Sequence, residues 1–478
     1  MATEPKRPKI VEERQDSLNV FLQWCGQIGL ELNEKVCVGL EGTVAEYGML
    51  AKEDIDEREV LFTVPRKAIL HQESSKVSGV LDKGTLRFQE IVAAVFFRLS
   101  FLISEKITLD SASSWVPLLL ALLHEYTSPQ SFWRPYLSLW NDFRKLDHPM
   151  FWSKEERDTL LKGTGIPEAV NTDLDKIHKE YSDVVLPLIT KYSEYWTPNI
   201  HTLDLYTNLV AFVMAYSFQE PNEEDDDEDE DEEDKAPNPP MMVPMADMLN
   251  HVANHNAQLE FTPESLKMVS IRPICKGEEV FNTYGQMANW QLLHMYGFTE
   301  PFPSNSNDTV DIPVSNFFTA ARDIKTDFEL SLLDEKWRLL NQIEGNDAII
   351  FGNQGCLTDS TLNTVLKVFC MSQEEFLDLK ENEGWEEDND EEDTATALSN
   401  EGLPKLKTIW KKLIHGAARL TLSCYTESNE VAEEKDDPDK MLMEDKKSLA
   451  KLSSRQQRAL HVRYGQKSIL HKLLELTN

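Results

Sequence analysis

Two short polar stretches contain the residues of this chain that are best suited to chemistry. The first, MADMLNHVANHN at 245–256, holds one aspartate, two histidines and three asparagines within twelve residues. The second, EEVFNTYG at 278–285, ends in a tyrosine and a glycine. Three interpretations of the first stretch are open: a metal site, a cluster of polar side chains that satisfy one another, or half of a pocket completed by the second stretch.

The metal interpretation depends on spacing. His251 and His255 are four residues apart and Asp247 lies one turn earlier, so a helix would place all three on one face. Zinc hydrolases with this histidine spacing carry glutamate directly after the first histidine, where this chain has Val252. Asparagine is also a poor zinc ligand. We therefore predict no metal, and this stretch alone leaves the polar cluster and the pocket open.

The segments around these stretches have the composition of strands. Residues 43–70 mix β-branched and aromatic residues with turn formers, and residues 268–285 repeat the pattern more faintly. In both, an isoleucine (Ile55 or Ile274) and a short charged turn precede Glu-Val and an apolar residue. The pattern predicts two similar strand–turn–strand units that can join in one small antiparallel fold.

Helical patterns fill most of the remaining sequence. Residues 113–126 are apolar on nearly every face, which predicts a buried helix with Ser113 or Ser114 as its N-cap and Pro117 in its first turn. Apolar residues recur at helical intervals from Leu205 to Tyr216. Amphipathic segments follow Gly297, and the last of them opens with a capping box at Ser453 and Gln456. Acidic stretches at 381–393 and 426–446 predict loops.

Charge and composition limit the function classes. The formal net charge is −35, with 83 acidic and 48 basic residues, which argues against direct nucleic-acid binding and favours basic partners. Residues 223–234 are all acidic and predict a disordered loop. The six cysteines form no CxxC pair, so no zinc cluster or disulfide framework is predicted. The longest apolar run, thirteen residues from Ile91, is short of the roughly 20 residues that span a membrane.

Taken together, the two polar stretches resemble the SET-domain protein lysine methyltransferases. Asn250-His251 after an apolar run, and a strand that ends in the motif FNTYG at 281–285, match the two crossing segments of that family. The segment EYGMLAKEDIDEREVLFTVP at 46–65 resembles its first segment. Further matches resemble the branch of the Rubisco large-subunit methyltransferase: SFWRPYLSLW, PMFW, AYSFQ and NTYGQMANWQLLHMYGF.

The resemblance implies an α+β fold, in which a β-rich SET domain with an inserted helical subdomain precedes an all-α C-terminal substrate-binding domain. It predicts the following bounds: an N-terminal segment at 1–40, the SET domain at 41–298, its helical insertion at about 113–218, its disordered acidic loop at 220–240, and the helical domain at 299–478. Residues 84–108 match no part of the pattern. The loop from Ala45 to Gly48 has a single glycine where many relatives have two.

The implied reaction is methyl transfer from S-adenosylmethionine to the amine of a protein lysine. A lysine has a pKa of about 10.4 in water, and burial beside a positive sulfonium lowers that pKa and supplies a neutral amine. The resemblance implies that Tyr284 is the catalytic residue. It assigns cofactor contacts to Ala45, Glu46, Tyr47, Tyr216, Asn250 and His251. It assigns substrate contacts to Trp115, Tyr216, Gln219 and Tyr296.

The expected partners are non-histone proteins with a lysine in a basic context, with transcription factors and histones as further candidates, and neither nucleic acid nor membrane. The fragment PKRPK and the family analogy predict a nuclear location, with the cytoplasm as a second compartment. Two alternatives stay open: a histidine-specific methyltransferase and a catalytically silent SET module that binds peptides. The sequence does not specify the substrate, the number of methyl groups added or the oligomeric state.

Overall fold

The structure is a computed structural model that describes residues 9–81, 109–222, 238–324, 330–341, 347–381, 398–426 and 437–478. The chain separates into two compact units, which are described one at a time below. The first comprises Met1–Met150 and Thr172–Gly285, and the second comprises Phe151–Asn171 and Gln286–Asn478. The apolar run from Ile91, residues 84–108 and the acidic run at 223–234 lie outside the described residues. The domain boundaries taken from the sequence remain predictions.

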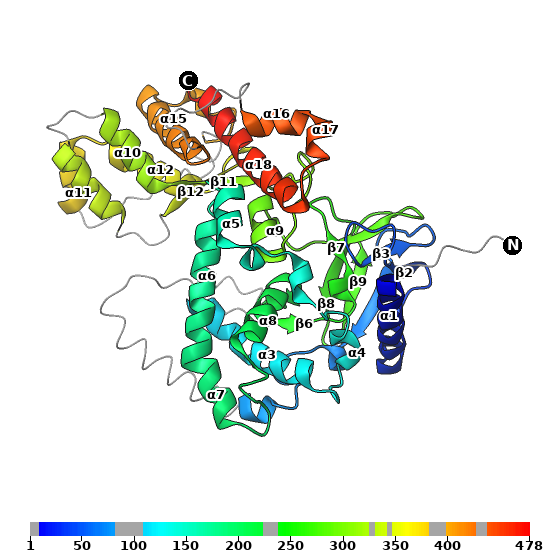
Figure 1. Cartoon of the computed structure of the whole chain (residues 1–478). Helices are drawn as coiled ribbons and strands as arrows, with labels where there is room; N and C mark the ends of the chain where they lie inside the picture. The colour runs from blue at the N-terminus through cyan, green and yellow to red at the C-terminus, as the bar shows by residue number, and fades with distance from the viewer. Residues whose placement is uncertain are drawn as a thin grey trace. The chain divides into compact units, whose positions relative to one another are not determined.

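Two four-stranded sheets form the centre of the first unit (Figure 1), with strand orders β1-β4-β9-β8 and β2-β3-β10-β7. The strands of the first sheet are β1 (Glu31–Leu32), β4 (Val60–Pro65), β9 (Ser265–Ser270) and β8 (Ala257–Phe261). Those of the second are β2 (Val36–Gly39), β3 (Gly48–Ala51), β10 (Glu279–Asn282) and β7 (Asn250–His251). Each sheet therefore joins strands from both ends of the unit's sequence.

The two strand–turn–strand units predicted from the sequence pair with each other. Strand β4 pairs antiparallel with β9, and β3 pairs antiparallel with β10. Between these pairs Ile55 and Ile274 form a bridge, in which the Ile55 N–H donates to the Ile274 carbonyl at 2.9 Å and the Ile274 N–H donates back at 3.0 Å. Both side chains are buried. The isoleucines that mark the sequence echo thus meet, and the predicted antiparallel arrangement is confirmed.

The first unit also contains helices, one before β4 in the sequence and several after it. Helix α1 (Lys9–Ile28) buries Leu18, Phe21 and Cys25, which recur at helical spacing, and contacts the short helix α4 (Arg134–Leu137). The insertion contributes α3 (Leu109–Thr127), α7 (Leu186–Lys191), α8 (Leu203–Tyr216) and most of α6 (Ile166–Glu180) to this unit, whereas α5 (Lys154–Leu160) and the start of α6 belong to the second unit. Residues of α3 contact α8, so the two apolar helices bury each other. The predicted start of α3 at Ser113 or Ser114 is wrong, because the helix begins at Leu109 and contains Pro117 in its interior.

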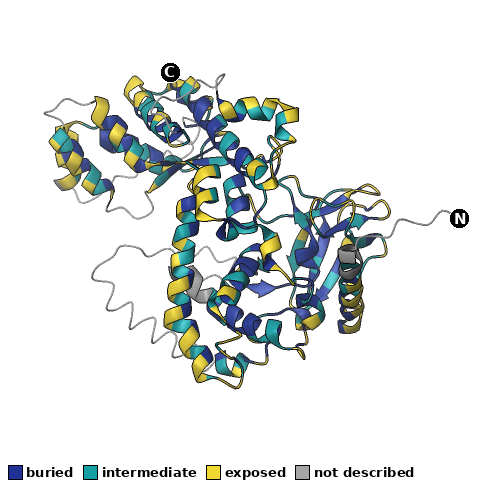
Figure 2. Ribbon diagram, viewed as in Figure 1, coloured by how far each residue is buried: buried dark blue, intermediate teal, exposed yellow. Residues whose placement is uncertain are grey.

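The two short strands that follow α8 complete the first unit. Strand β5 (Ser217–Phe218) pairs antiparallel with β6 (Met241–Met242), and Leu70 after β4 bridges to Met242. Figure 2 shows that buried residues are concentrated in the strands of the sheets, while the outer face of α1 is exposed. The Asn250-His251 strand therefore lies at the border of a densely packed core. Among the described residues, no helix is both long enough and apolar enough to cross a membrane.

The second unit is mostly helical. Its helices are α9 (Asn289–Tyr296), α10 (Val314–Ile324), α11 (Leu330–Leu340), α12 (Asp359–Cys370), α13 (Gln373–Glu381), α15 (Thr408–Ser423), α16 (Pro438–Glu444), α17 (Lys446–Leu449) and α18 (Ser454–Leu476). It also contains a three-stranded sheet, β11 (Thr309–Pro313), β12 (Ala348–Gly352) and β13 (Gly355–Cys356), which the expectation of an all-α domain did not include. Alternating burial along β11 packs Val310 and Ile312 into the core of this unit. Helix α18 begins with the predicted capping box at Ser453 and Gln456.

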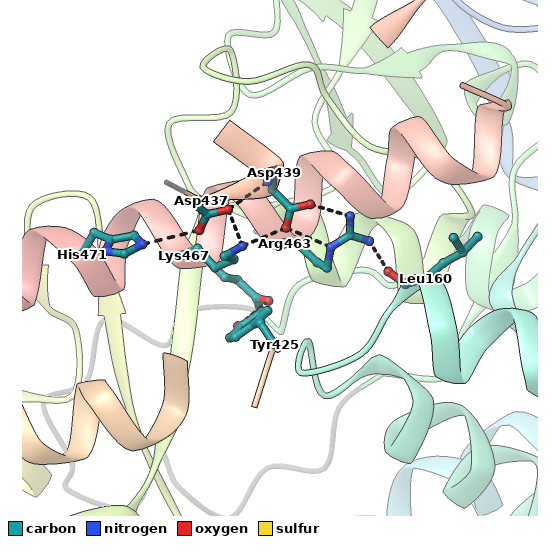
Figure 3. Close-up of polar contacts among 8 residues, drawn as sticks. Leu160, Tyr425, Asp437, Asp439, Arg463, Lys467 and His471 are labelled. Carbon is teal, nitrogen blue, oxygen red and sulfur yellow. Dashed lines mark hydrogen bonds and ion pairs between the residues drawn. The ribbon is translucent and has the colours of Figure 1, made fainter. Parts of the chain in front are cut away.

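The prediction of a loop at 426–446 is wrong for the part that the structure describes, because α16 and the start of α17 lie there. The apolar residues of α16 are three neighbours, 441–443, which have no helical spacing and are not buried. Buried ion pairs instead join α16 to α18 (Figure 3). The Asp439 carboxylate accepts hydrogen bonds from Arg463 Nη2 at 2.7 Å and Lys467 Nζ at 3.0 Å. The Asp437 carboxylate accepts a hydrogen bond from Lys467 Nζ at 2.6 Å. His471 Nε2 lies 3.5 Å from Asp437. We call Asp437, Asp439, Arg463, Lys467 and His471 the ionic cluster.

Candidate active site

The two polar stretches of the sequence lie side by side in the first unit. Strand β7 pairs in parallel with β10, so that Asn250 stands opposite Phe281 and His251 opposite Asn282. The helix on which the zinc interpretation depended is absent: a 3₁₀ turn at Ala246–Met248 leads through extended Leu249 into β7. Within the described residues, no group of three His, Cys, Asp or Glu side chains could hold a metal ion.

The side chain of Asn250 is fixed by two acceptors. Its Nδ2 donates to the Tyr47 carbonyl at 2.8 Å and to Glu279 Oε1 at 2.6 Å. A carbonyl and a carboxylate accept hydrogen bonds and do not donate them, so they determine which end of the amide faces them. No polar contact of the described residues occupies the amide oxygen, which can therefore accept a hydrogen bond from a ligand.

The Glu279 side chain of β10 links the loop before β3 to the Asn250 side chain through hydrogen bonds. Its Oε2 accepts the backbone N–H of Val44 at 2.9 Å, although the two residues are 235 positions apart in the sequence. Burial raises the pKa of Glu279, whereas the hydrogen bonds from Asn250 and Val44 lower it. The space beside the carboxylate is tight, because a Cβ atom on Gly48 would lie 2.5 Å from Glu279 Oε1 and 2.5 Å from Thr43 Cγ2. Only glycine fits at position 48.

We expect Gly48→Ala to displace the Glu279 carboxylate and with it Asn250. Overpacking of this kind costs about 1–3 kcal/mol, and the affinity for S-adenosylmethionine should fall by about tenfold or more. Calorimetric titration and thermal unfolding measure the two effects. Gly79→Ala is the matched control, because a Cβ atom there meets no other atom within 4 Å. Equal behaviour of the two variants would show that the Gly48 contact is unimportant.

His251 supports Tyr284 from two directions. The imidazole Nδ1 accepts the backbone N–H of Tyr284 at 3.0 Å, and the two rings stack with centroids 5.1 Å apart. The Tyr284 hydroxyl donates to the Leu249 carbonyl at 2.8 Å. Burial, together with the nearby His255, lowers the pKa of His251 to about 4, so the ring is neutral at neutral pH and Nδ1 can accept. The tyrosine is thereby held at its backbone, its ring and its hydroxyl.

Asn256 has a structural task that the sequence did not distinguish from ligand binding. Its Oδ1 accepts the Phe281 N–H at 2.7 Å, and its Nδ2 donates to the Glu279 carbonyl at 2.9 Å. The side chain, which is 2% exposed, thus satisfies backbone groups of β10 as a neighbouring strand would. The polar-cluster interpretation therefore holds for this asparagine.

Aromatic contacts connect Tyr47 to Tyr216 through Trp140. Tyr47 meets Trp140 edge-on with centroids 6.2 Å apart, and Trp140 lies 4.3 Å from Tyr216 at an interplanar angle of 38°. Trp140 Nε1 is buried and has no hydrogen-bond partner among the described residues. Burial raises the pKa of Tyr47 to about 12 and that of Tyr216 further, so both hydroxyls stay neutral. These rings offer an aromatic surface and one free donor.

The other residues predicted from the sequence are more dispersed. Ala45 is exposed, and its carbonyl accepts the Thr43 hydroxyl at 3.0 Å, while Glu46 pairs with Arg14 at 2.8 Å. Gln219 is exposed and donates to the Asn238 carbonyl at 3.1 Å. Trp115 is half-buried in α3, and the described part of the chain shows no ring or polar contact from it to Asn250 or Tyr284. Tyr296 belongs to α9 of the second unit, where it meets Phe298 edge-on at 6.2 Å.

Sequence reasoning missed Glu279, Trp140 and Asp247 as members of this region. Glu279 was noted only as part of a strand echo, although alternation along a strand already placed it on the opposite face from exposed Glu278. Asp247 was considered only as a metal ligand. Its carboxylate instead accepts the Tyr136 hydroxyl at 2.5 Å. Trp140 had no signal other than its place in an aromatic-rich motif.

Two family models match the chain. The SET domain model matches residues 46–285, and the model described as Rubisco LSMT substrate-binding matches residues 329–470. The N-lysine methyltransferase setd6 of Salmo salar is 62% identical over the full length of both chains. The human N-lysine methyltransferase SETD6 is 44% identical, again with 100% of both chains covered. The chain belongs to the SETD6 family of SET-domain proteins.

Solved structures agree with this family at the level of the fold. The structure of Rubisco LSMT bound to AdoMet has a TM-score of 0.59 and covers 96% of this chain and 91% of its own, at 18% identity. The SET domain of LSMT bound to lysine and AdoHcy has the same TM-score with 97% of this chain covered. The family, the α+β fold with its SET and substrate-binding parts, the methyltransferase class and the cofactor predicted for this SETD6-family chain are confirmed.

Proposed function

We propose that the chain transfers methyl groups from S-adenosylmethionine to the ε-amine of lysine in proteins, with Tyr284 as the catalytic residue. The observation that carries this assignment of residues is the convergence at β7 and β10. There Asn250 presents an oriented amide, and Tyr284 is fixed by His251 and the Leu249 carbonyl. Methyl transfer requires that the methyl donor and the amine be held in alignment, and fixed side chains of this kind can hold them.

The groups around Asn250 suit the cofactor. The amide oxygen of Asn250 can accept a hydrogen bond from the ammonium group at the amino-acid end of the cofactor. The rings of Trp140 and Tyr216 can stack on the adenine, and Trp140 Nε1 can donate a hydrogen bond. We assign Tyr47 and His251 to the same site through their contacts with Asn250 and Tyr284. We assign exposed Ala45 and half-buried Glu46 to its edge. When bound, S-adenosylmethionine supplies an electrophilic methyl group on a sulfonium.

The lysine must arrive as a neutral amine. An apolar environment disfavours its ammonium form, and the proton leaves to water. The neutral amine would then form the N–C bond as the S–CH3 bond breaks, with the neutral thioether as the leaving group. The Tyr284 hydroxyl donates a hydrogen bond to the Leu249 carbonyl, so the lone pairs of its oxygen face away from that bond. They can accept a hydrogen bond from the amine N–H or a weak one from the polarised methyl C–H. No carboxylate base is required in this scheme.

On the substrate side, we propose that Trp115, Tyr216, Gln219 and Tyr296 contact the protein that carries the lysine. The net charge of −35 supports substrates with basic residues around the target, because an acidic surface attracts a basic segment and steers its approach. We propose transcription factors and histones as candidate substrates and the nucleus as the main location. These assignments go beyond methyl transfer itself and require their own tests.

Labelled methyl transfer tests the function. Incubation of the purified chain with isotope-labelled S-adenosylmethionine and separate nuclear and cytoplasmic extracts should label proteins on lysine, chiefly in the nuclear extract. Asn250→Ala should weaken S-adenosylmethionine binding by about 10- to 100-fold through loss of one charge-assisted contact. Asn254→Ala, an exposed neighbour, is the control and should bind normally. Label on histidine would favour the histidine-specific alternative, and cofactor binding without any labelled product would favour a silent module.

A further inference from the structure

Asp247 stands out among the buried acidic groups of the first unit. It is 4% exposed and belongs to the 3₁₀ turn Ala246–Met248 immediately before the Asn250 strand. Its Oδ2 accepts the Tyr136 hydroxyl at 2.5 Å, while its Oδ1 is buried without a hydrogen-bond partner among the described residues. A buried carboxylate with an unused oxygen is costly to a fold and calls for a physical reason.

The turn that carries Asp247 is strained and leads directly to Tyr284. Met245 has φ of 80° and ψ of −41°, a backbone conformation that non-glycine residues rarely adopt. Four residues later, Leu249 presents the carbonyl that accepts the Tyr284 hydroxyl. Strain of this kind persists only where surrounding contacts hold it in place. The Tyr136–Asp247 bond is such a contact, because it fastens the turn to α4.

We propose that Asp247 is a positioning residue for methyl transfer: bonded to Tyr136, it fixes the turn that sets the Leu249 carbonyl and thereby the Tyr284 hydroxyl. Tyr136 is suited to this role because it is fully buried and packs against Phe21 of α1 at 6.2 Å. The inference rests on the proposed role of Tyr284 and adds a residue that does not touch the reacting atoms.

The surroundings of Asp247 favour the neutral form. Within the described ranges, the titratable groups that face it come from three helices: Cys25 of α1, Tyr136 of α4 and Tyr216 of α8, all neutral at neutral pH. Burial raises the pKa of Asp247 to about 7, against the lowering effect of the Tyr136 hydroxyl and the nearby N–H groups. Because the pKa of Asp247 is raised in the folded state, its carboxyl contributes to folding stability. The full contribution is present at pH values below the ordinary pKa near 3.8, and it is lost as the pH rises through about 7.

Two substitutions at position 247 separate charge from shape. Asn keeps an acceptor for Tyr136 and cannot ionise, whereas Leu has a similar volume and removes the acceptor. We expect Asp247→Asn to remain close to wild type at pH 6 and Asp247→Leu to lose about 100-fold in kcat, as expected for a displaced catalytic group, with the dissociation constant for S-adenosylmethionine nearly unchanged. Equal impairment of the two variants, or full activity of the Leu variant, would overturn the proposal.

The pH dependence gives a readout that a purely structural role would not move. The ratio of wild-type to Asp247→Asn kcat/KM should fall about tenfold between pH 6 and pH 8, because a group with a pKa of about 7 goes from nine-tenths to one-tenth protonated. Ionisation of the substrate lysine affects both enzymes and cancels in the ratio. A ratio that stays constant across this range would contradict the role of the neutral carboxyl.

Tyr136→Phe keeps the test decisive if Asp247→Leu fails to fold. Loss of the hydroxyl removes a hydrogen bond that lowers the pKa of Asp247, so the inflection in the wild-type profile should move to higher pH in this variant. An unmoved inflection would refute the coupling. Failure of the proposed function is distinguishable, since a wild-type chain without lysine methylation at any pH would reject that function and leave no profile to compare.

Discussion

Tyr284→Phe is expected to bind S-adenosylmethionine with nearly wild-type affinity and to lose methyl transfer by about 100-fold or more. The variant keeps the ring that stacks on His251 and the backbone N–H that donates to His251 Nδ1. It removes only the hydroxyl that the Leu249 carbonyl holds in place. The lost oxygen is the one we assign to the amine and the methyl group. Single-turnover rates and calorimetric titration together separate the loss of chemistry from a loss of binding.

Tyr181→Phe is the matched control for this variant. Tyr181 also donates to a backbone carbonyl at 2.8 Å, that of His201, but it lies in the helical insertion at the end of α6. Both substitutions should cost stability by about 1 kcal/mol, the usual net value of one hydrogen bond. Only the change at position 284 should reduce the rate. Wild-type turnover in Tyr284→Phe, or an equal rate loss in both variants, would remove Tyr284 from the chemistry.

Lys467→Met should destabilise the second unit by about 3–5 kcal/mol, the usual cost of removing one partner from a buried ion pair. Lys467 Nζ bonds Asp437 at 2.6 Å and Asp439 at 3.0 Å, and the Lys467 side chain is only 6% exposed. Methionine fills similar space but leaves Asp437 with His471 and the backbone N–H of Asp439 as its partners in the ionic cluster. For a unit of this size the loss corresponds to a decrease in Tm of about 6–20 °C, which differential scanning calorimetry measures.

Lys154→Met provides the comparison within the same unit. Lys154 also forms an ion pair at 2.6 Å, with Asp158, but its side chain is 70% exposed. Such an exposed pair contributes about 0–1 kcal/mol. If the two substitutions lower the Tm equally, burial is not what makes the ionic cluster important.

The pH dependence of the ionic cluster follows from its aspartates. Burial alone would raise the pKa of Asp437, but hydrogen bonds from His471 and Lys467 hold it well below its ordinary value, and Arg463 and Lys467 lower that of Asp439. A depressed folded pKa contributes stability above the unfolded value of about 3.9, and that stability is lost as the pH falls further. The second unit should therefore weaken in acid, and Lys467→Met should show a smaller acid effect.

The central strand pairs of the two four-stranded sheets were accessible from the sequence, because the repeated Ile and Glu-Val patterns at Ile55 and Ile274 marked strands that pair with each other. The helix α16 was not accessible in this way. Its sequence is rich in charge and was interpreted as a loop, and the contacts that join it to α18 are ion pairs with residues far along the chain. Hydrophobic periodicity detects elements that bury apolar faces and gives no signal for one held by charges.

The site shows the same division. The proximity of Asn250, His251 and Tyr284 was predictable because their motifs are short and specific, and the structure brings the three residues together. The support behind them depends on geometry that no local pattern contains. Glu279 orients Asn250, and Tyr136 meets Asp247, a residue 111 positions away. The roles of Asn256 and Asn250 differ although both are asparagines of one twelve-residue stretch, since one satisfies a strand and the other keeps a free oxygen.

The pairing of β3 with β10 has a consequence for how such proteins can diverge. The two strands lie on either side of the entire helical insertion, so their pairing closes a very long loop. The entropic cost of closing a flexible loop grows only with the logarithm of its length, by about 0.6 kcal/mol for each doubling. The length of the insertion can therefore change with little loop-closure cost, provided that Tyr136, Trp140 and Tyr216, which contact the candidate site from within it, keep their places.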